Sequence, residues 1–128
     1  MEYVLEQSGA GKIVLVVDDE ASVRMVGVEM MAELGFQVLE ADSGAAALKI
    51  LDDRADVALL LTDIRMPGMD GLELARQAAE LRPEMKIIFV SGYTTAPTPL
   101  PAPLLGKPYG HEQLEKVVTR QLGTGAAS

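Results

Sequence analysis

Short apolar runs alternate along the chain with segments in which apolar residues recur every three or four positions. The runs predict strands at 13–17, 36–41, 57–62 and 86–90, and the pair Leu104-Leu105 predicts a short fifth strand. The periodic segments predict helices at 21–34, 45–51, 72–81 and 111–122. The first and third runs are apolar at almost every position, which is typical of strands buried on both faces. This repetition predicts an α/β fold, an open parallel sheet with helices on both faces.

One segment interrupts the alternation. Within 96–103, Pro occupies every second position, at Pro97, Pro99, Pro101 and Pro103. Alternating Pro removes every second backbone donor and favours polyproline II, so no helix can form there. The fourth and fifth strands are therefore expected to be joined by an extended Pro-rich loop.

Composition restricts the class of protein. A chain of 128 residues suffices for one domain with a core, and 48% hydrophobic with 23% charged residues is an ordinary globular balance. Lys and Arg total 11 against 19 Asp and Glu, and the resulting net charge of −8 argues against direct binding to nucleic acid or anionic membranes. The absence of Cys excludes disulfides, Cys-ligated zinc and thiol catalysis.

No targeting or membrane-spanning segment is apparent in the chain. The longest apolar run is far shorter than the ~20 residues that cross a bilayer, and the first residues lack the basic-then-apolar order of a signal peptide. We expect a cytoplasmic domain over 13–122, preceded by a linker at 1–12 and followed by a flexible tail at 123–128.

Reactive polar residues stand where four of the predicted strands end. Asp18 and Asp19 follow the first strand, Asp63 the third and Ser91 the fourth, and Lys107 lies just after the fifth. Open α/β sheets bind ligands outside the carboxyl ends of their strands. A single acid after a strand usually caps the next helix, but four strands that each end on a reactive group indicate a site.

The chemistry of this set is that of phosphoryl transfer. Three converging carboxylates would repel one another and raise their own pKa values, and a hard cation such as Mg²⁺ relieves that repulsion. Lys107 suits a phosphoryl oxygen or a carboxylate, and Ser91 can donate a hydrogen bond to a phosphoryl oxygen. The set predicts transfer of a phosphoryl group to a carboxylate nucleophile with metal assistance.

Four motifs, in this order along the chain, resemble the receiver domain of two-component response regulators. They are Val16-Val17-Asp18-Asp19-Glu20, the turn from Thr62-Asp63 to Asp70-Gly71, Val90-Ser91-Gly92-Tyr93 and Lys107-Pro108. The resemblance spans 13–122 and implies a flavodoxin-like, doubly wound five-stranded parallel sheet of order 2-1-3-4-5. The Pro-rich segment departs from the family, so we expect the fourth helix to be missing or replaced by a loop.

The resemblance also implies a role for each site residue. Asp63 corresponds to the phosphoryl acceptor, Asp19 to a direct Mg²⁺ ligand, and Asp18 to a neighbouring acid that acts chiefly through water. The backbone carbonyl of Arg65 would complete the protein's share of the coordination. The implied metal set is therefore Asp18, Asp19, Asp63 and the Arg65 carbonyl.

Two further residues complete the implied site. Ser91 would bond the phosphoryl group, and Lys107 would pair with the acceptor carboxylate or its phosphoryl oxygen. The peptide bond before Pro108 is expected to be cis, as is usual in the family. Leu104 stands where the family normally has an aromatic switch residue, which puts that mode of activation in question.

The implied function is that of a phosphoacceptor domain in a two-component phosphorelay. It would take a phosphoryl group from the phospho-His of a histidine kinase or histidine phosphotransfer protein and pass the signal by protein–protein contact. The domain would assist its own phosphorylation and dephosphorylation without being an enzyme in the usual sense. It is either a free-standing regulator or the receiver of a longer protein such as a hybrid histidine kinase, and the linker-like residues 1–12 favour the second. Partner recognition is expected mainly on the first helix, 21–34.

Two other functions compete with this one. A pseudo-receiver that acts only as a binding module would require loss of an acid, the acceptor or the Lys, and all of them are present. A small phosphatase that forms an aspartyl phosphate, of the haloacid dehalogenase pattern, needs a second Asp two residues after the nucleophile, where Arg65 stands. The single His111 opens an amphipathic helix, which favours a surface or capping role over phosphoryl acceptance.

Overall fold

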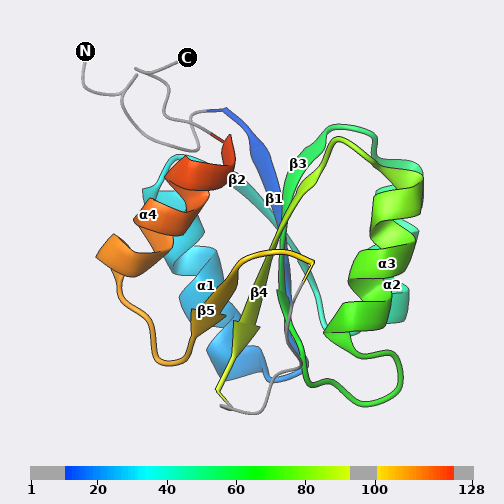
Figure 1. The fold of residues 1–128 in the computed structure, drawn as a ribbon, viewed down its shortest axis with the longest axis horizontal. Helices are drawn as coiled ribbons and strands as arrows, with labels where there is room; N and C mark the ends of the chain where they lie inside the picture. Colours follow the sequence, from blue (N-terminus) through cyan, green and yellow to red (C-terminus); the bar gives the residue numbers. More distant parts are fainter. Residues whose placement is uncertain (1–10, 93–100, 123–128) are drawn as a thin grey trace.

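The computed structural model describes residues 11–92 and 101–122 of the chain. Within them, strands and helices follow the order that the periodicity predicts (Figure 1). The strands are β1 (Ile13–Val17), β2 (Gln37–Ala41), β3 (Val57–Asp63), β4 (Lys86–Ser91) and β5 (Leu104–Gly106). The helices are α1 (Ala21–Glu33), α2 (Gly44–Asp53), α3 (Gly71–Leu81) and α4 (His111–Leu122). No helix in these two ranges is both long and apolar enough to cross a bilayer.

The five strands form one parallel sheet in the order β2-β1-β3-β4-β5. Helices α1 and α4 cover one face of the sheet, and α2 and α3 cover the other (Figure 1). The doubly wound, flavodoxin-like arrangement is confirmed. Because β1 and β3 are neighbours, and β4 and β5 follow, all four predicted polar strand ends lie along one edge of the sheet.

Strand β1 belongs to two hydrophobic cores at once. Ile13, Leu15 and Val17 pack with residues of α2 and α3, while Val14 and Val16 pack with residues of α1 and α4. Each of the five is at most 8% exposed, and burying one such side chain stabilises a fold by about 1.5–3 kcal/mol. A strand buried on both faces has no polar positions to alternate, which explains the continuous apolar run.

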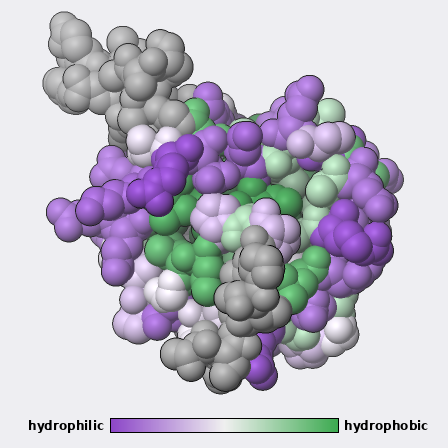
Figure 2. Space-filling view, viewed as in Figure 1, coloured by the Kyte–Doolittle hydropathy of each residue, from purple (hydrophilic) through white to green (hydrophobic). Residues whose placement is uncertain are grey.

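The connection from β4 to β5 differs from the other crossovers. No helix occurs in its described residues, 92 and 101–103, whereas residues 93–100 lie outside the described residues. The Phe89 N–H donates to the Pro103 carbonyl at 2.8 Å, and Ala102 packs against a cluster formed by Ile64, Ala75 and Phe89. The space-filling view has apolar surface over β4 and β5, between the hydrophilic outer sides of α4 and α3 (Figure 2). Residues 101–103 therefore contact the sheet without forming a helix.

Element boundaries agree with the predicted ones to within two residues, and those of β1 and α4 are identical to them. Phe36, expected to open β2, instead belongs to the turn after α1, where its N–H donates to the Met31 carbonyl at 3.1 Å. Gly35 adopts φ 98°, a left-handed conformation that ends a helix and favours Gly. Ser43 caps α2 by accepting from the Ala46 N–H at 3.1 Å. The expected tail at 123–128, and residues 1–10 of the expected linker, lie outside the described residues.

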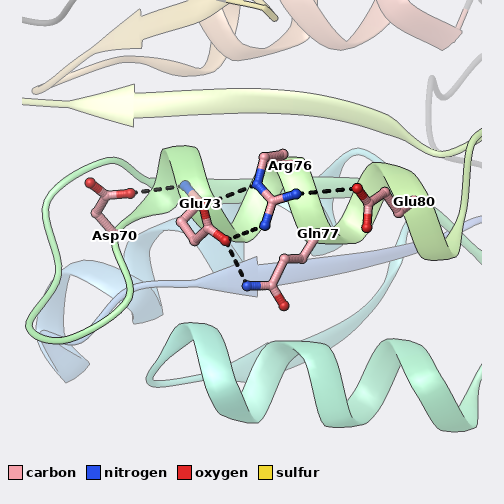
Figure 3. A network of polar contacts seen from close by, with 5 residues as sticks. All are labelled: Asp70, Glu73, Arg76, Gln77 and Glu80. Carbon is pink, nitrogen blue, oxygen red and sulfur yellow. Dashed lines mark hydrogen bonds and ion pairs between the residues drawn. The ribbon is translucent and has the colours of Figure 1, made fainter.

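Polar side chains stabilise the exposed surface of α3 (Figure 3). Asp70 caps the helix by accepting from the Glu73 N–H at 2.9 Å. Arg76 donates to Glu73 at 2.6 Å and to Glu80 at 3.2 Å, and Gln77 donates to Glu73 at 2.8 Å. The hydrogen bonds from Arg76 and Gln77 lower the pKa of Glu73 to about 2. These contacts stabilise the first turns and the exposed face of α3.

Gly71, the first residue of α3, allows the helix to approach the end of β3. Its N–H donates to the Ile64 carbonyl at 2.7 Å, and a Cβ atom there would collide with the Asp63 carbonyl and lie 2.9 Å from the Ile64 Cα. We predict that Gly71→Ala lowers the free energy of unfolding by at least about 1–3 kcal/mol, as overpacking does. Urea denaturation measures this.

Gly106→Ala is the matched control for this substitution. A Cβ at Gly106 would meet no atom within 4 Å, so this variant should unfold at the wild-type urea concentration. Equal stability of Gly71→Ala and Gly106→Ala would show that the close approach at Gly71 does not constrain the fold.

Candidate functional site

Three carboxylates meet at the carboxyl ends of β1 and β3. Asp18, Asp19 and Asp63 each offer one oxygen, and these oxygens lie within 4.8 Å of one another. Asp18 and Asp63 are buried, with 4% and 8% of their surface exposed, whereas Asp19 is exposed to solvent. We call these three residues the carboxylate cluster. The residues that the sequence singled out as acids of one site are therefore brought together.

Hydrogen bonds fix Asp18 on every side. Its Oδ1 accepts from the Glu20 N–H at 3.0 Å and its Oδ2 from the Lys107 ammonium at 3.2 Å. Its own N–H donates to the Ala41 carbonyl of β2 at 3.2 Å, and its carbonyl accepts from Arg24 Nη1 at 2.8 Å. Asp18 is consequently a fixed anchor, whereas Asp19 presents its carboxylate to solvent.

Backbone contacts hold Asp63 in its place at the end of β3. The Asp63 carbonyl accepts from the Thr62 hydroxyl at 2.9 Å, and the next N–H, that of Ile64, donates to the Val90 carbonyl at 3.0 Å. The Asp63 carboxylate accepts from the Arg65 backbone N–H. Its position is thus set by β4 and by the turn toward Gly71.

Lys107 provides the cation of the site. Its Nζ lies 3.2 Å from Asp18 Oδ2 and 3.3 Å from Asp63 Oδ2, and its side chain is 20% exposed. Its N–H donates to the Ser91 carbonyl at 2.8 Å, so the β4–β5 pairing sets its position. The peptide bond to Pro108 is cis, as the sequence led us to expect.

The charges of the site shift its pKa values. Burial raises the pKa of Asp63 and the Asp18 charge raises it further, and the opposing effect of Lys107 is too small to reverse the net rise. Burial lowers the pKa of Lys107, but the charges of Asp18 and Asp63 outweigh it, so that pKa also rises. With the acids ionised, three negative charges and one positive charge leave a net charge of −2, which favours binding of a divalent cation.

Ser91 occupies the expected place at the end of β4. It is buried, with 4% of its surface exposed, and pairs in register with Gly106 of β5. In the neighbouring strand pair, Asp63 lies beside Val90. Ser91 is therefore one residue beyond the strand position that adjoins Asp63, on the same edge of the sheet.

Two residues lie near the cluster although the sequence did not place them in the site. Arg24 contacts the Asp18 carbonyl, as described above, and Tyr109 lies close to α1, with its hydroxyl 3.3 Å from where a Cβ of Gly27 would lie. Burial raises the pKa of Tyr109. A glycine inside a helix costs about 1 kcal/mol relative to alanine, and Gly27 in α1 was the available signal for this close packing. His111, as expected, is on the surface, 2.9 Å from Glu33.

A groove lies beside the site, between α1 and the turn that follows β5. It has a volume of about 540 Å³ and is lined by Ser22, Val23, Val26, Lys107, Pro108 and Tyr109. Two large apolar side chains of α1, Met25 and Val26, are 59% and 46% exposed. Because Lys107 belongs both to the groove and to the carboxylate site, a partner bound in the groove would lie next to that site.

Comparison with known proteins assigns the chain to a family. A family model for the response regulator receiver domain matches residues 14–119. The chain is 35% identical to the response regulator receiver protein CpdR of Brucella abortus (strain 2308), over 87% of this chain and 97% of that protein. It is 36% identical to the sensor kinase CckA of the same strain, over 95% of this chain but only 14% of the kinase. The solved structure of the response regulator TrrA of Thermotoga maritima, in complex with Mg²⁺-BeF, matches with a TM-score of 0.80 and 31% identity, over 87% of this chain and 99% of that one.

The raised pKa of Asp63 predicts a stability difference that depends on pH. A carboxyl whose pKa is higher in the folded than in the unfolded protein contributes stability below its ordinary pKa of 3.8, and that contribution is lost as the pH rises through the folded value. At pH 7 without metal, Asp63→Asn should therefore melt at a higher temperature than wild type. The difference should vanish toward pH 3, as thermal melts in EDTA across this range would measure.

Two other variants control for this comparison. Lys107→Met removes the cation that Asp18 and Asp63 share, so it should lower the melting temperature at pH 7. Asp56→Asn, at an exposed acid paired with Arg54 at 2.9 Å, should give no gain. A lower melting temperature for Asp63→Asn than for wild type at pH 7 would contradict the charge balance described here.

Proposed function

Because the chain belongs to the response regulator receiver domain family, we propose that it is a phosphoacceptor domain whose acceptor is Asp63. The observation that carries this proposal is the pairing of a buried carboxylate, at the end of β3, with the Lys107 ammonium at 3.3 Å. A buried nucleophile beside a fixed cation is suited to reaction with an anionic donor. Asp18 and Asp19, the remaining acids of the carboxylate cluster, lie beside this pair.

The reaction is transfer of a phosphoryl group from a phospho-His to Asp63. An oxygen of the Asp63 carboxylate attacks phosphorus, the N–P bond breaks, and its electron pair returns to the imidazole of the donor. Lys107, already placed between Asp18 and Asp63, balances the charge of the arriving phosphoryl oxygens. Ser91, from the adjacent strand end, donates to a phosphoryl oxygen.

The oxygen donors present fit a divalent cation. The carboxylate cluster offers three hard oxygens within 4.8 Å of one another and carries the net negative charge that such an ion requires. Asp19, which is exposed, would bind it directly, and the Arg65 carbonyl would add a ligand. Asp18, whose two oxygens already accept hydrogen bonds, would act through water. Bound Mg²⁺ would supply Lewis-acid stabilisation of the phosphoryl charge.

We assign partner recognition to α1 and the groove beside it. Met25 and Val26 expose apolar surface on α1, and the groove adjoins Lys107 and hence the acceptor. An apolar helix face next to the reacting group fits a helical partner that carries the phospho-His. A histidine kinase or a histidine phosphotransfer protein satisfies that description, and contact between proteins would then pass the signal on.

The functional unit is proposed to comprise 13–122, with 1–12 as a linker and 123–128 as a tail. It is a signalling domain that contributes groups to its own phosphorylation and dephosphorylation, rather than an enzyme that acts on a separate substrate. The relatives are compatible both with a free-standing receiver protein and with a receiver that forms part of a longer protein. CpdR is matched over 97% of its length, whereas CckA is matched over 14%, as part of a longer kinase.

Incubation with acetyl phosphate and Mg²⁺ tests the acceptor directly. We predict addition of one phosphoryl group to wild type, with the alkali lability of an acyl phosphate, because the carboxylate is the nucleophile. Asp63→Asn should remain unlabelled, and EDTA should slow the labelling of wild type. Intact-mass spectrometry measures each outcome.

The control variant is Asp56→Asn, which removes an exposed acid just before β3, at the opposite end of that strand from the acceptor. It should be labelled at the wild-type rate. Labelling of Asp63→Asn to the same extent as wild type would refute Asp63 as the acceptor.

A further inference from the structure

Arg24 of α1 joins three elements beside the carboxylate cluster. Its Nη1 donates to the Asp18 carbonyl, at the end of β1, at 2.8 Å. Its Nε donates to Glu40 Oε1, on β2, at 2.9 Å. The Arg24 side chain is 18% exposed, so most of it lies within the protein. One guanidinium therefore fixes the end of β1 relative to both α1 and β2.

The Asp18 carbonyl, which accepts the hydrogen bond from Arg24, is significant because of its place in the backbone. The Asp18 carbonyl and the Asp19 N–H belong to one planar peptide unit. A hydrogen bond that fixes this carbonyl also fixes the peptide plane before the Asp19 Cα. It thereby restricts the direction in which the Asp19 side chain leaves the backbone. The carboxylate of the same residue accepts from the Glu20 N–H and from Lys107, so loosening the Asp18 backbone would also weaken these bonds. Arg24 thus acts on the orientation of Asp19, the exposed acid of the cluster.

Glu40 determines which atoms of Arg24 face the site. It lies beside Val16 in the pairing of β1 with β2, and its contact with Nε leaves Nη1 directed at the Asp18 carbonyl. A guanidinium has its donors in a rigid fork, so holding one of them orients the others.

We propose that Arg24, oriented by Glu40, is a positioning residue that sets the geometry of the acids for a divalent cation. The inference rests on the proposed function, because it presumes that the carboxylate cluster binds Mg²⁺. Residues that orient metal ligands typically change metal affinity by 10–100-fold when they are replaced. Arg24→Met should accordingly weaken Mg²⁺ binding by at least about tenfold.

Electrostatics alone predicts the opposite sign. Removing a positive charge near three carboxylates should tighten the binding of a cation, so weaker binding cannot be attributed to charge. Arg54→Met is the matched control, because Arg54 pairs with Asp56 at 2.9 Å at the surface and is equally an Arg in an ion pair. We expect its Mg²⁺ affinity to equal that of wild type.

Two variants at Glu40 separate positioning from charge. Glu40→Gln and Glu40→Leu remove the same charge, but only Gln retains an oxygen that can accept from Arg24 Nε. Glu40→Gln should bind Mg²⁺ as wild type does, whereas Glu40→Leu should bind it more weakly. If Glu40 acts only through Arg24, the double variant Arg24→Met with Glu40→Leu should be no weaker than Arg24→Met alone.

The experiment is isothermal titration of each intact protein with Mg²⁺, well below its melting temperature, together with amide hydrogen exchange without metal. A merely structural Arg24 would lower the melting temperature but leave the Mg²⁺ Kd unchanged. Equal Kd values for wild type and Arg24→Met, or equal weakening by Arg54→Met, would overturn the inference. Glu40→Leu gives the same test if Arg24→Met does not fold.

The exchange measurement separates this inference from the proposed function. The Glu20 amide, which donates to Asp18 Oδ1, should exchange faster in Arg24→Met than in wild type. If wild type does not bind Mg²⁺, the metal site of the proposed function is wrong. The exchange rate of the Glu20 amide then tests by itself whether Arg24 positions the end of β1. Unchanged exchange at Glu20 in Arg24→Met would refute the positioning role.

Discussion

Three carboxylates lie together at the carboxyl end of the sheet, where a single ammonium pairs with two of them, and this excess of negative charge governs the site. Lys107 approaches Asp18 at 3.2 Å and Asp63 at 3.3 Å, yet the pKa of Asp63 still rises, because burial and the Asp18 charge outweigh the cation. A site left with net negative charge is costly for the protein alone and favourable for a cation or for a reaction that redistributes the charge. The proposed chemistry follows from this imbalance.

The rest of the fold serves to maintain the crowding. Like charges would separate unless the backbone held them, and β1 and β3, which carry the acids, are buried through contacts with helices on both faces. The pairing of β5 with β4 brings Lys107 to the same edge. Gly71 admits α3 to the end of β3, and Arg24 fixes the end of β1. The burial of apolar side chains in the core thus offsets the electrostatic repulsion among the carboxylates of the cluster.

Much of this arrangement could be predicted from the sequence, because it depends on patterns that are local in the chain. The burial of β1 on both faces is visible in the sequence as five consecutive apolar residues. The ends of β1 and β3 are visible as acidic residues that end an apolar run. Strand order, by contrast, came from the family resemblance, because periodicity does not report which strands are neighbours. The role of Arg24 could not be inferred, because its partner Glu40 lies sixteen residues away and their contact depends on how α1 packs against β2. Phe36 begins the apolar run 36–41 and is therefore predicted to belong to β2, but its N–H bonds to the Met31 carbonyl in the turn after α1 instead.

A crystal structure of the protein with Mg²⁺ and beryllofluoride, a phosphoryl mimic, would test the central claim most directly. The account predicts beryllium bonded to an Asp63 oxygen, the cation against the carboxylate cluster, and the Lys107 ammonium moved from its position between Asp18 and Asp63 to a fluorine atom. Beryllofluoride bound elsewhere, with Lys107 still between the two carboxylates, would contradict the account.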